Sequence, residues 1–143
     1  MKDTVHVRTE FEIGECATIS KEVTEEDIAL FARITGDYNP VHIDSDFACK
    51  TRFKGRIAHG MLTAGLVSAV LGTKLPGPGS IYLSQSLKFT RPVRIGDRLT
   101  AEAKVTDWNP AKKTIRLNTR CFNQAGEDVL TGEALLLVEP LLS

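Results

Sequence analysis

The stretch that decides the fold is Gly60-Met-Leu-Thr-Ala-Gly-Leu-Val-Ser-Ala-Val-Leu71. It contains no charged residue and no polar face, and a helix that is apolar on all sides must be enclosed by protein. The stretch is too short to cross a bilayer, which takes about 20 apolar residues. Gly72 and the run Pro76-Gly-Pro-Gly79 end it. The sequence therefore predicts a buried central helix over residues 60–71.

The second half of the chain predicts the protein that encloses this helix. Four segments have the alternation or apolar character of strands: 80–91, 99–108, the stretch with Ile115, Leu117 and Cys121, and 129–138. Turn sequences at 109–111 and 125–126 separate the later ones. Four strands with short connections predict an antiparallel meander, and a curved sheet would cover the helix. The predicted fold class is α+β, a single hot-dog fold with an antiparallel sheet wrapped around a central buried helix.

The first half predicts a strand over 11–22 and then a helix that Thr24 caps and Gly36 ends. A short helical turn is expected around 46–50. A single copy of this fold leaves sheet edges and one side of the central helix uncovered. We therefore expect a homodimer.

Length and composition point to one domain over 1–143. Lys plus Arg number 18, as do Asp plus Glu, which argues against nucleic acid or anionic membrane as the main partner. The first fifteen residues contain no apolar core of a secretory signal, and no stretch is long enough to span a membrane. Three widely spaced cysteines suggest neither a disulfide framework nor a zinc site, and indicate a reducing cytoplasm.

Asp37 and His42 are the candidate catalytic pair. They lie five positions apart on the turn Asp37-Tyr-Asn-Pro-Val-His42, which Pro40 stiffens, so a carboxylate and an imidazole can converge on one water. An alternative stays open, in which Asp37 only closes an Asx-turn and His42 is a buried, hydrogen-bonded histidine. Spacing alone does not separate the two.

His59-Gly60 begins the central helix, where free N–H groups and the helix dipole can bind a thioester carbonyl. The alternative is a glycine chosen for tight packing. Ser68, inside the apolar helix, needs a hydrogen-bond partner, a carbonyl one turn back or a loop group. A basic run at 50–56 can meet coenzyme A phosphates or an acidic carrier protein, or be a solvated loop. The histidines and cysteines show no metal-ligand pattern, so no metal is expected.

These residues resemble a known family. The motif Phe31-Ala-Arg-Ile-Thr-Gly-Asp-Tyr-Asn-Pro-Val-His42, followed by Ala48, is similar to that of the R-specific enoyl-CoA hydratases, the hydratase 2 or MaoC-like group. The likeness continues through four further segments: Ala58-His-Gly-Met61, Gly79-Ser-Ile-Tyr-Leu-Ser-Gln-Ser86, Pro92-Val-Arg-Ile-Gly-Asp97 and Thr131-Gly-Glu-Ala134. It covers nearly the whole chain from about Glu22 onward.

The resemblance implies a hot-dog dimer without metal or redox cofactor that hydrates trans-2-enoyl-CoA to (R)-3-hydroxyacyl-CoA, with short or medium acyl chains. It implies that Asp37 and His42 hold and activate the water and that Gly60 receives the thioester carbonyl. The further residues that it assigns to loop support or substrate binding are Ser68, Asn39, Leu71 and Leu136.

Three other functions stay open from the sequence. A hot-dog thioesterase commonly carries a carboxylate on the central helix, and residues 60–71 contain none. A carrier-protein 3-hydroxyacyl dehydratase shares the chemistry but not the thiol. A non-catalytic acyl-CoA-binding protein would keep the fold without turnover.

Overall fold

The computed structural model describes residues 4–143, so the first three residues of the predicted domain lie outside the described part. The helices are α1 (Glu25–Thr35), α2 (Pro40–Ile43), α3 (Ser45–Ala48) and α4 (Gly60–Thr73). The strands are β1 (Cys16–Glu22), β2 (Ile81–Gln85), β3 (Lys88–Phe89), β4 (Arg98–Asn109), β5 (Thr114–Phe122) and β6 (Asp128–Leu137). One antiparallel sheet carries the order β1-β4-β5-β6-β2, with β3 also paired to β6. The α+β hot-dog arrangement is confirmed.

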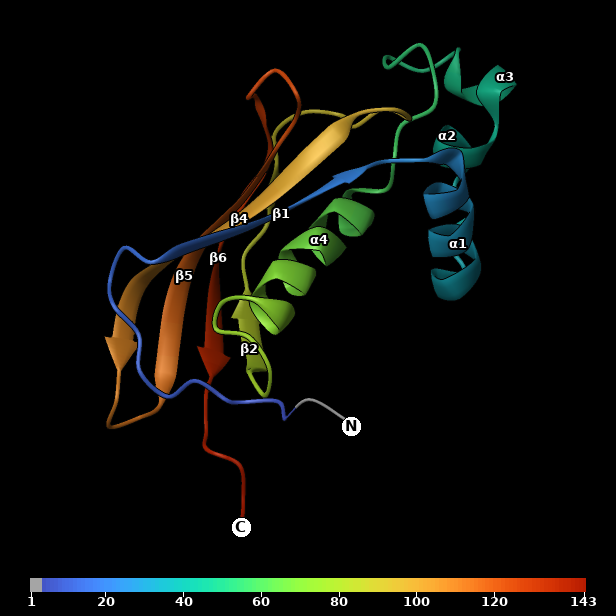
Figure 1. Ribbon diagram of the computed structural model, residues 1–143. Coiled ribbons are helices and arrows are strands. Elements are labelled where there is room, and N and C mark those ends of the chain that lie inside the picture. Colours follow the sequence, from blue (N-terminus) through green and yellow to red (C-terminus); the bar gives the residue numbers. More distant parts are fainter. Residues whose placement is uncertain (1–3) are drawn as a thin grey trace.

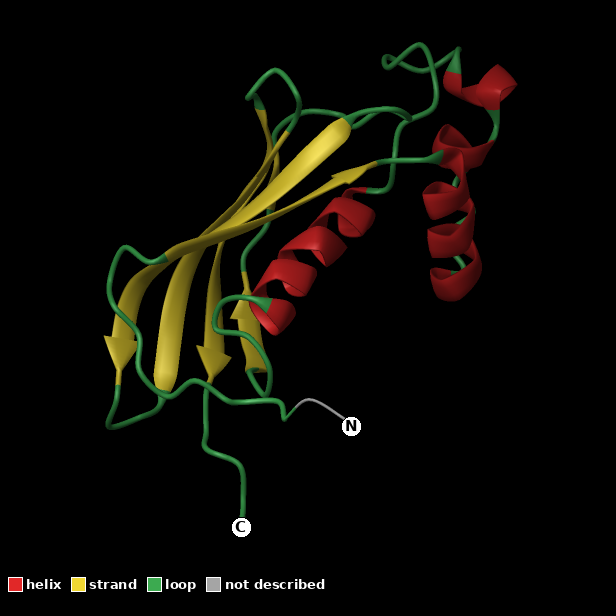
Figure 2. Ribbon diagram, in the orientation of Figure 1, coloured by secondary structure: helices red, strands yellow, loops and turns green. Residues whose placement is uncertain are grey.

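Helix α4 lies along one face of the sheet, and α1, α2 and α3 are grouped beyond it (Figure 1). Strands form one layer with all the helices on the same side (Figure 2). The buried face of α4 consists of Thr63, Val67, Val70 and Leu71. It meets alternate residues of β4, among which Ala101 and Ala103 leave room for the helix to approach. The predicted alternation over 99–108 is therefore confirmed, with Leu99 to Val105 as its buried positions.

The side of α4 that faces away from the sheet is exposed. Met61, Gly65 and Ser68 follow one another at helical spacing on this side, and Met61 is 55% exposed. The expectation that one copy leaves part of the helix uncovered is thus confirmed. The neighbouring edge strand β2 is also open, since Ile81 and Leu83 are each 50% exposed. Between them lies a hollow, the α4–β2 groove, which is lined by Met61, Ala64, Gly65, Ser68, Tyr82, Leu83, Ser84, Gln85 and Leu87.

The predicted meander of four strands is wrong in the position of its first strand, β2. Strands β4, β5 and β6 follow one another as expected, but β2 pairs with β6 and not with β4. The place beside β4 is taken by β1, with Cys16 opposite Lys104. Segment 80–91 precedes β4 directly in the sequence, so it was expected to lie beside β4. Instead β2 pairs with β6 and β1 pairs with β4, in both cases across a long separation in the chain.

Two strands are shorter than predicted. The first begins at Cys16 and not at residue 11, because the chain turns at 13–14 before it joins the sheet. The segment 80–91 is interrupted: the register shifts between Tyr82 and Ser84, and Ser86 bonds the backbone of Glu133 with both its N–H and its hydroxyl. Pairing resumes only at β3. None of the helices in residues 4–143 combines the length and apolar character that a membrane span requires.

Candidate active site

The loop that carries Asp37 is held by successive local hydrogen bonds. Helix α1 ends at Gly36, whose left-handed φ of 81° turns the chain while its N–H bonds Ala32. Asp37 then accepts from the N–H of Asn39 through Oδ1 (3.2 Å), and Asn39 accepts from Val41 through its own Oδ1. Asn39 is thereby the N-cap of α2. The Asx-turn alternative is correct as a description of Asp37 Oδ1, and it leaves Oδ2 without a role in the turn.

His42 is fixed in one tautomer. The side chain is 8% exposed, and Nδ1 lies 2.8 Å from the carbonyl oxygen of Ile57. A carbonyl can only accept, so Nδ1 carries the hydrogen and a neutral ring keeps a bare Nε2. Arg56 holds the same turn from outside by donating to the His42 carbonyl (2.7 Å) while it pairs with Glu25.

The surroundings of His42 favour the neutral ring. Burial lowers the pKa of the imidazole below its ordinary value of 6.5, although the hydrogen bond to Ile57 opposes it. The neighbouring His59 lowers this pKa further and the Asp37 carboxylate raises it. The net shift is downward, so near neutral pH Nε2 is available as a proton acceptor.

His59 joins the catalytic loop to the start of α4. It occupies the N-cap position without a side-chain capping bond and is 1% exposed. Its Nε2 lies 2.9 Å from the main-chain oxygen of Asp37, and its ring stacks on that of His42 with centroids 3.9 Å apart. Gly60 follows at once, and a Cβ built on it would come within 2.7 Å of the Phe89 ring. A glycine here permits the close approach of Phe89 to the helix tip.

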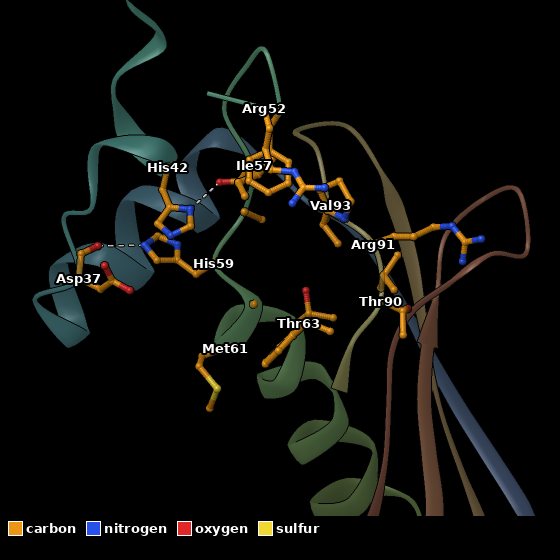
Figure 3. Close-up of a pocket in the computed structure, with 16 residues that line it drawn as sticks. Asp37, His42, Arg52, Ile57, His59, Met61, Thr63, Thr90, Arg91 and Val93 are labelled. Atoms are coloured by element: carbon orange, nitrogen blue, oxygen red, sulfur yellow. Dashed lines mark hydrogen bonds between the residues drawn. The ribbon is translucent and has the colours of Figure 1, made fainter. Parts of the chain in front are cut away.

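All these groups meet in one pocket of about 520 Å³. Asp37, His42, His59 and Gly60 line it together, and Figure 3 shows the carboxylate beside the two stacked rings. The apolar part of the lining consists of Ile57, Met61, Phe89, Pro92, Val93 and Val129. The first N–H groups of α4 have no intrahelical acceptor and no side-chain cap. The pocket therefore combines a carboxylate, a bare imidazole nitrogen and donors for a developing oxyanion.

The same cluster contains the set of side chains that could hold a metal ion. Asp37, His42 and His59 each place one potential ligand atom within 4.8 Å of those of the other two. Both rings use their other nitrogen on a backbone carbonyl, as metal-bound histidines do. The spacing 37, 42, 59 shows no metal-ligand pattern, and only the fold brings His59 to the other two. The expectation of no metal stays a prediction.

The other predicted site residues lie elsewhere. Ser68 lines the α4–β2 groove, two turns along the helix from Gly60, together with Met61, Gly65 and Leu83. Leu71 and Leu136 are fully buried members of the hydrophobic core, and neither lines the pocket that contains Asp37. Within a single chain the structure thus groups Asp37, His42 and Gly60 and leaves Ser68, Leu71 and Leu136 apart. Their assigned roles stay predictions.

Sequence reasoning missed three residues of this site. His59 was noted only as the start of the helix, although a buried histidine at an N-cap, where Ser, Thr, Asp and Asn are preferred, was a usable sign. Phe89 lies in the segment 80–91, for which the sequence predicted only a strand, and it lines the pocket with 51% exposure. Thr63 points its hydroxyl into the same space (Figure 3). No local pattern distinguished it from the other apolar-helix positions.

Comparison with known proteins shows the family to which the chain belongs. Residues 10–123 match the MaoC-like domain, and the chain belongs to the MaoC-like dehydratase family. It is 51% identical to an (R)-specific enoyl-CoA hydratase of Rhodospirillum rubrum, over 94% of this chain and 92% of the relative. It is 48% identical to a 3-hydroxybutyryl-CoA dehydratase of Methylorubrum extorquens, over 90% and 82%. The solved (R)-hydratase of Aeromonas caviae superposes with a TM-score of 0.88 at 45% identity, over 92% of this chain and all of that one.

Proposed function

We propose that the protein adds water to short- and medium-chain trans-2-enoyl-CoA to give (R)-3-hydroxyacyl-CoA, and catalyses the reverse dehydration. One observation carries the proposal: the Asp37 carboxylate, the bare nitrogen of His42 and the first turn of α4 open on the same pocket. The named activities of the R. rubrum and M. extorquens relatives support it. The handedness of the product and the range of chain lengths follow from this similarity and not from the geometry.

The reaction needs a polarised carbonyl and an activated water. The thioester oxygen accepts from the N–H groups at Gly60, which stabilises the negative charge that develops there. Asp37 takes a proton from the water as its oxygen bonds to the β-carbon, and the electron pair of the double bond moves toward the carbonyl. A proton must then reach the α-carbon.

We assign that second transfer to His42. A neutral ring with a bare Nε2 has no proton to give there, so it can supply one only after the proton of the water has reached it. Asp37 relays this proton to Nε2, and the ring passes it to the α-carbon. Both groups end as they began, and the product is the 3-hydroxyacyl thioester.

The opening of the pocket suits a coenzyme A thioester. Arg52 and Arg91 line it from two different segments (Figure 3), and guanidinium groups bind phosphates well. Arg91 already pairs with Glu127 at 3.2 Å, whereas Arg52 forms no ion pair with any of residues 4–143. Arg56 belongs to the same basic run in the sequence, yet it is bound to Glu25 and to the His42 carbonyl. We therefore assign the phosphates to Arg52 and not to Arg56.

We infer further that the chemistry uses no metal or other cofactor, because the acid–base pair and the helix N–H groups account for every proton and charge in the reaction. The three free cysteines support a reducing, cytoplasmic setting. Turnover is expected to be unchanged after treatment with EDTA. A loss that added Zn²⁺ or Mg²⁺ restored would contradict this.

We propose that the active form is a homodimer in which a second copy covers the α4–β2 groove. The groove is lined mainly by apolar and small side chains, and among residues 4–143 the strand β2 pairs only with β6, at the edge of the sheet. Open strand edges and apolar faces of this kind are normally covered in native proteins. Light scattering or sedimentation equilibrium should give twice the chain mass of 15.7 kDa.

The function itself is tested with purified protein and a series of enoyl-CoA substrates. Loss of the conjugated thioester absorbance with formation of the (R)-3-hydroxy product is the expected result. Release of free thiol without hydration would instead identify a thioesterase. Preference for carrier-bound substrate over crotonyl-CoA would identify a carrier-protein dehydratase, and binding without turnover would identify a sensor.

A further inference from the structure

His59 is an unusual residue for the place it occupies. The N-cap of a helix favours Ser, Thr, Asp or Asn, whose short side chains bond the free N–H groups, and His59 makes no such bond. It is also 1% exposed, and within the described part of the chain its Nδ1 is a buried polar atom without a hydrogen-bond partner. Both features cost stability. A leucine or phenylalanine would fill the space without an unpaired nitrogen, so packing alone does not explain the residue.

Within residues 4–143 the ring of His59 makes one polar contact, and this contact shows what the residue contributes to the site. Nε2 lies 2.9 Å from the main-chain oxygen of Asp37, across 22 positions of sequence. Because a carbonyl only accepts, Nε2 carries the hydrogen, and the neutral ring leaves Nδ1 bare. Rings on two sides fix its orientation: Phe31 with centroids 4.6 Å apart and His42 with centroids 3.9 Å apart. The donor is thus aimed at the backbone of the candidate general base.

This contact links the two halves of the reaction site. Asp37 belongs to the loop after α1, whereas the N–H groups that would bind the thioester carbonyl belong to the first turn of α4. His59 is the residue directly before Gly60, where that turn begins. We propose that His59 is a positioning residue, which sets the distance between the carboxylate and the bound thioester by donating Nε2–H to the Asp37 carbonyl. The inference rests on the proposed function, because the distance matters only if a thioester binds at Gly60.

Two amide substitutions separate positioning from structural support. Glutamine carries its amide nitrogen near the place of a histidine Nε2, whereas asparagine carries it near the place of Nδ1. His59→Gln therefore keeps a donor for the Asp37 carbonyl and His59→Asn does not. Asparagine is in addition one of the best N-cap residues, so His59→Asn should hold or raise the free energy of unfolding.

We expect the two variants to rank in opposite orders in kcat and in thermal stability. His59→Asn should lose about 10- to 100-fold in kcat with a small change in KM, since misplacement of reacting groups by about 1 Å can cost as much as 100-fold. His59→Gln should stay within a few-fold of the wild-type kcat while being the less stable variant by thermal unfolding. A merely structural residue would give the same order for both measurements. Equal kcat values for the two variants would overturn the proposal.

The tautomer of His59 can be measured in the wild-type protein, so this test does not depend on the folding of a variant. Nitrogen-15 correlation spectra of the histidine rings should show a proton on Nε2 of His59 and a neutral His42 with its proton on Nδ1. A His59 proton on Nδ1 would overturn the proposal. Failure of the proposed function is distinguishable, because it would appear as a wild-type protein that does not hydrate enoyl-CoA.

Discussion

The first turn of helix α4 and its exposed side differ in chemistry. The pocket at the first turn brings together a carboxylate, two imidazoles and free backbone donors. Among residues 4–143, Tyr82 is the one ionisable side chain that lines the α4–β2 groove along the side. Burial raises the pKa of this phenol, so it too stays neutral. One helix therefore presents a reactive end and an apolar flank.

This difference explains how an apolar helix can serve an enzyme. The carboxylate and one imidazole at its tip come from other segments, namely the Asp37 loop and α2, while the helix supplies backbone N–H groups, His59 at its N-cap and the hydroxyl of Thr63. The flank can then be reserved for contacts that exclude water. Substitutions at the two places should accordingly change different measurements.

The largest effect is expected at the reactive end. Asp37→Asn keeps the Asx-turn oxygen but removes the base, so kcat should fall by about 10²- to 10⁴-fold with little change in thermal stability. Steady-state hydration of crotonyl-CoA measures it. Asp46→Asn is the matched control, since it removes an exposed carboxylate on α3, outside the pocket. Equal turnover of the two variants would remove Asp37 from the mechanism.

The second effect concerns assembly and belongs to the flank. Leu83→Arg places a charge on the half-exposed edge strand of the α4–β2 groove. Burial of that charge against a second copy is costly, so the dimer dissociation constant should rise by roughly 10- to 100-fold. Sedimentation at several concentrations measures the shift. Lys88→Arg, which keeps the charge at an exposed position of β3, should leave assembly unchanged.

A smaller effect compares two glycines of the same helix. Gly60→Ala forces the Phe89 ring away from the helix tip, because the new Cβ would lie 2.7 Å from it. We expect about a tenfold loss in kcat/KM. Gly72→Ala meets nothing within 4 Å, so it should leave kinetics unchanged and stabilise the helix by about 0.5–1 kcal/mol. Identical kinetics for both variants would show that the helix tip does not bind the substrate.

Much of the fold was predictable because it depends on local patterns. The uncharged stretch from Gly60 predicted α4, and the alternation at Leu99 to Val105 predicted the strand beneath it. The position of β2 was not predictable, since pairing with β6 across 50 residues carries no local mark. The same holds for the interruption at Ser86, which depends on contacts with Glu133.

The site divides in the same way. Asp37 and His42 share one turn, so their proximity could be inferred from spacing and from the family resemblance. His59 reaches Asp37 only because its ring packs against His42 of α2, and Phe89 reaches Gly60 only because β3 pairs with β6. Spacing in sequence reveals neither contact. Residues contributed by distant segments are therefore the ones that sequence reasoning missed.

The smallest expected effect is a shift in the pH profile at the reactive end. Burial and the neighbouring His59 hold the pKa of His42 below 6.5, against the opposing influence of Asp37 and the Ile57 carbonyl. Because the neutral ring is the active form, kcat/KM should decline on acidification with a midpoint below pH 6.5.

The same shift makes folding pH-dependent, with the sign set by the unfolded chain. Below about pH 6.5 His42 is protonated in the unfolded chain but stays neutral in the folded one until its lower pKa is reached. The free energy of unfolding should therefore decrease as the pH falls. Replacing His59 by Gln removes one of the two influences that lower the pKa of His42, and the acid limb of that variant should move upward in pH. Burial lowers the pKa of His42 most strongly and is kept in the variant, so this movement should be small. A proton NMR titration of the His42 ring measures the midpoint directly, and a value above 6.5 in the wild-type protein would contradict the assignment of a neutral base.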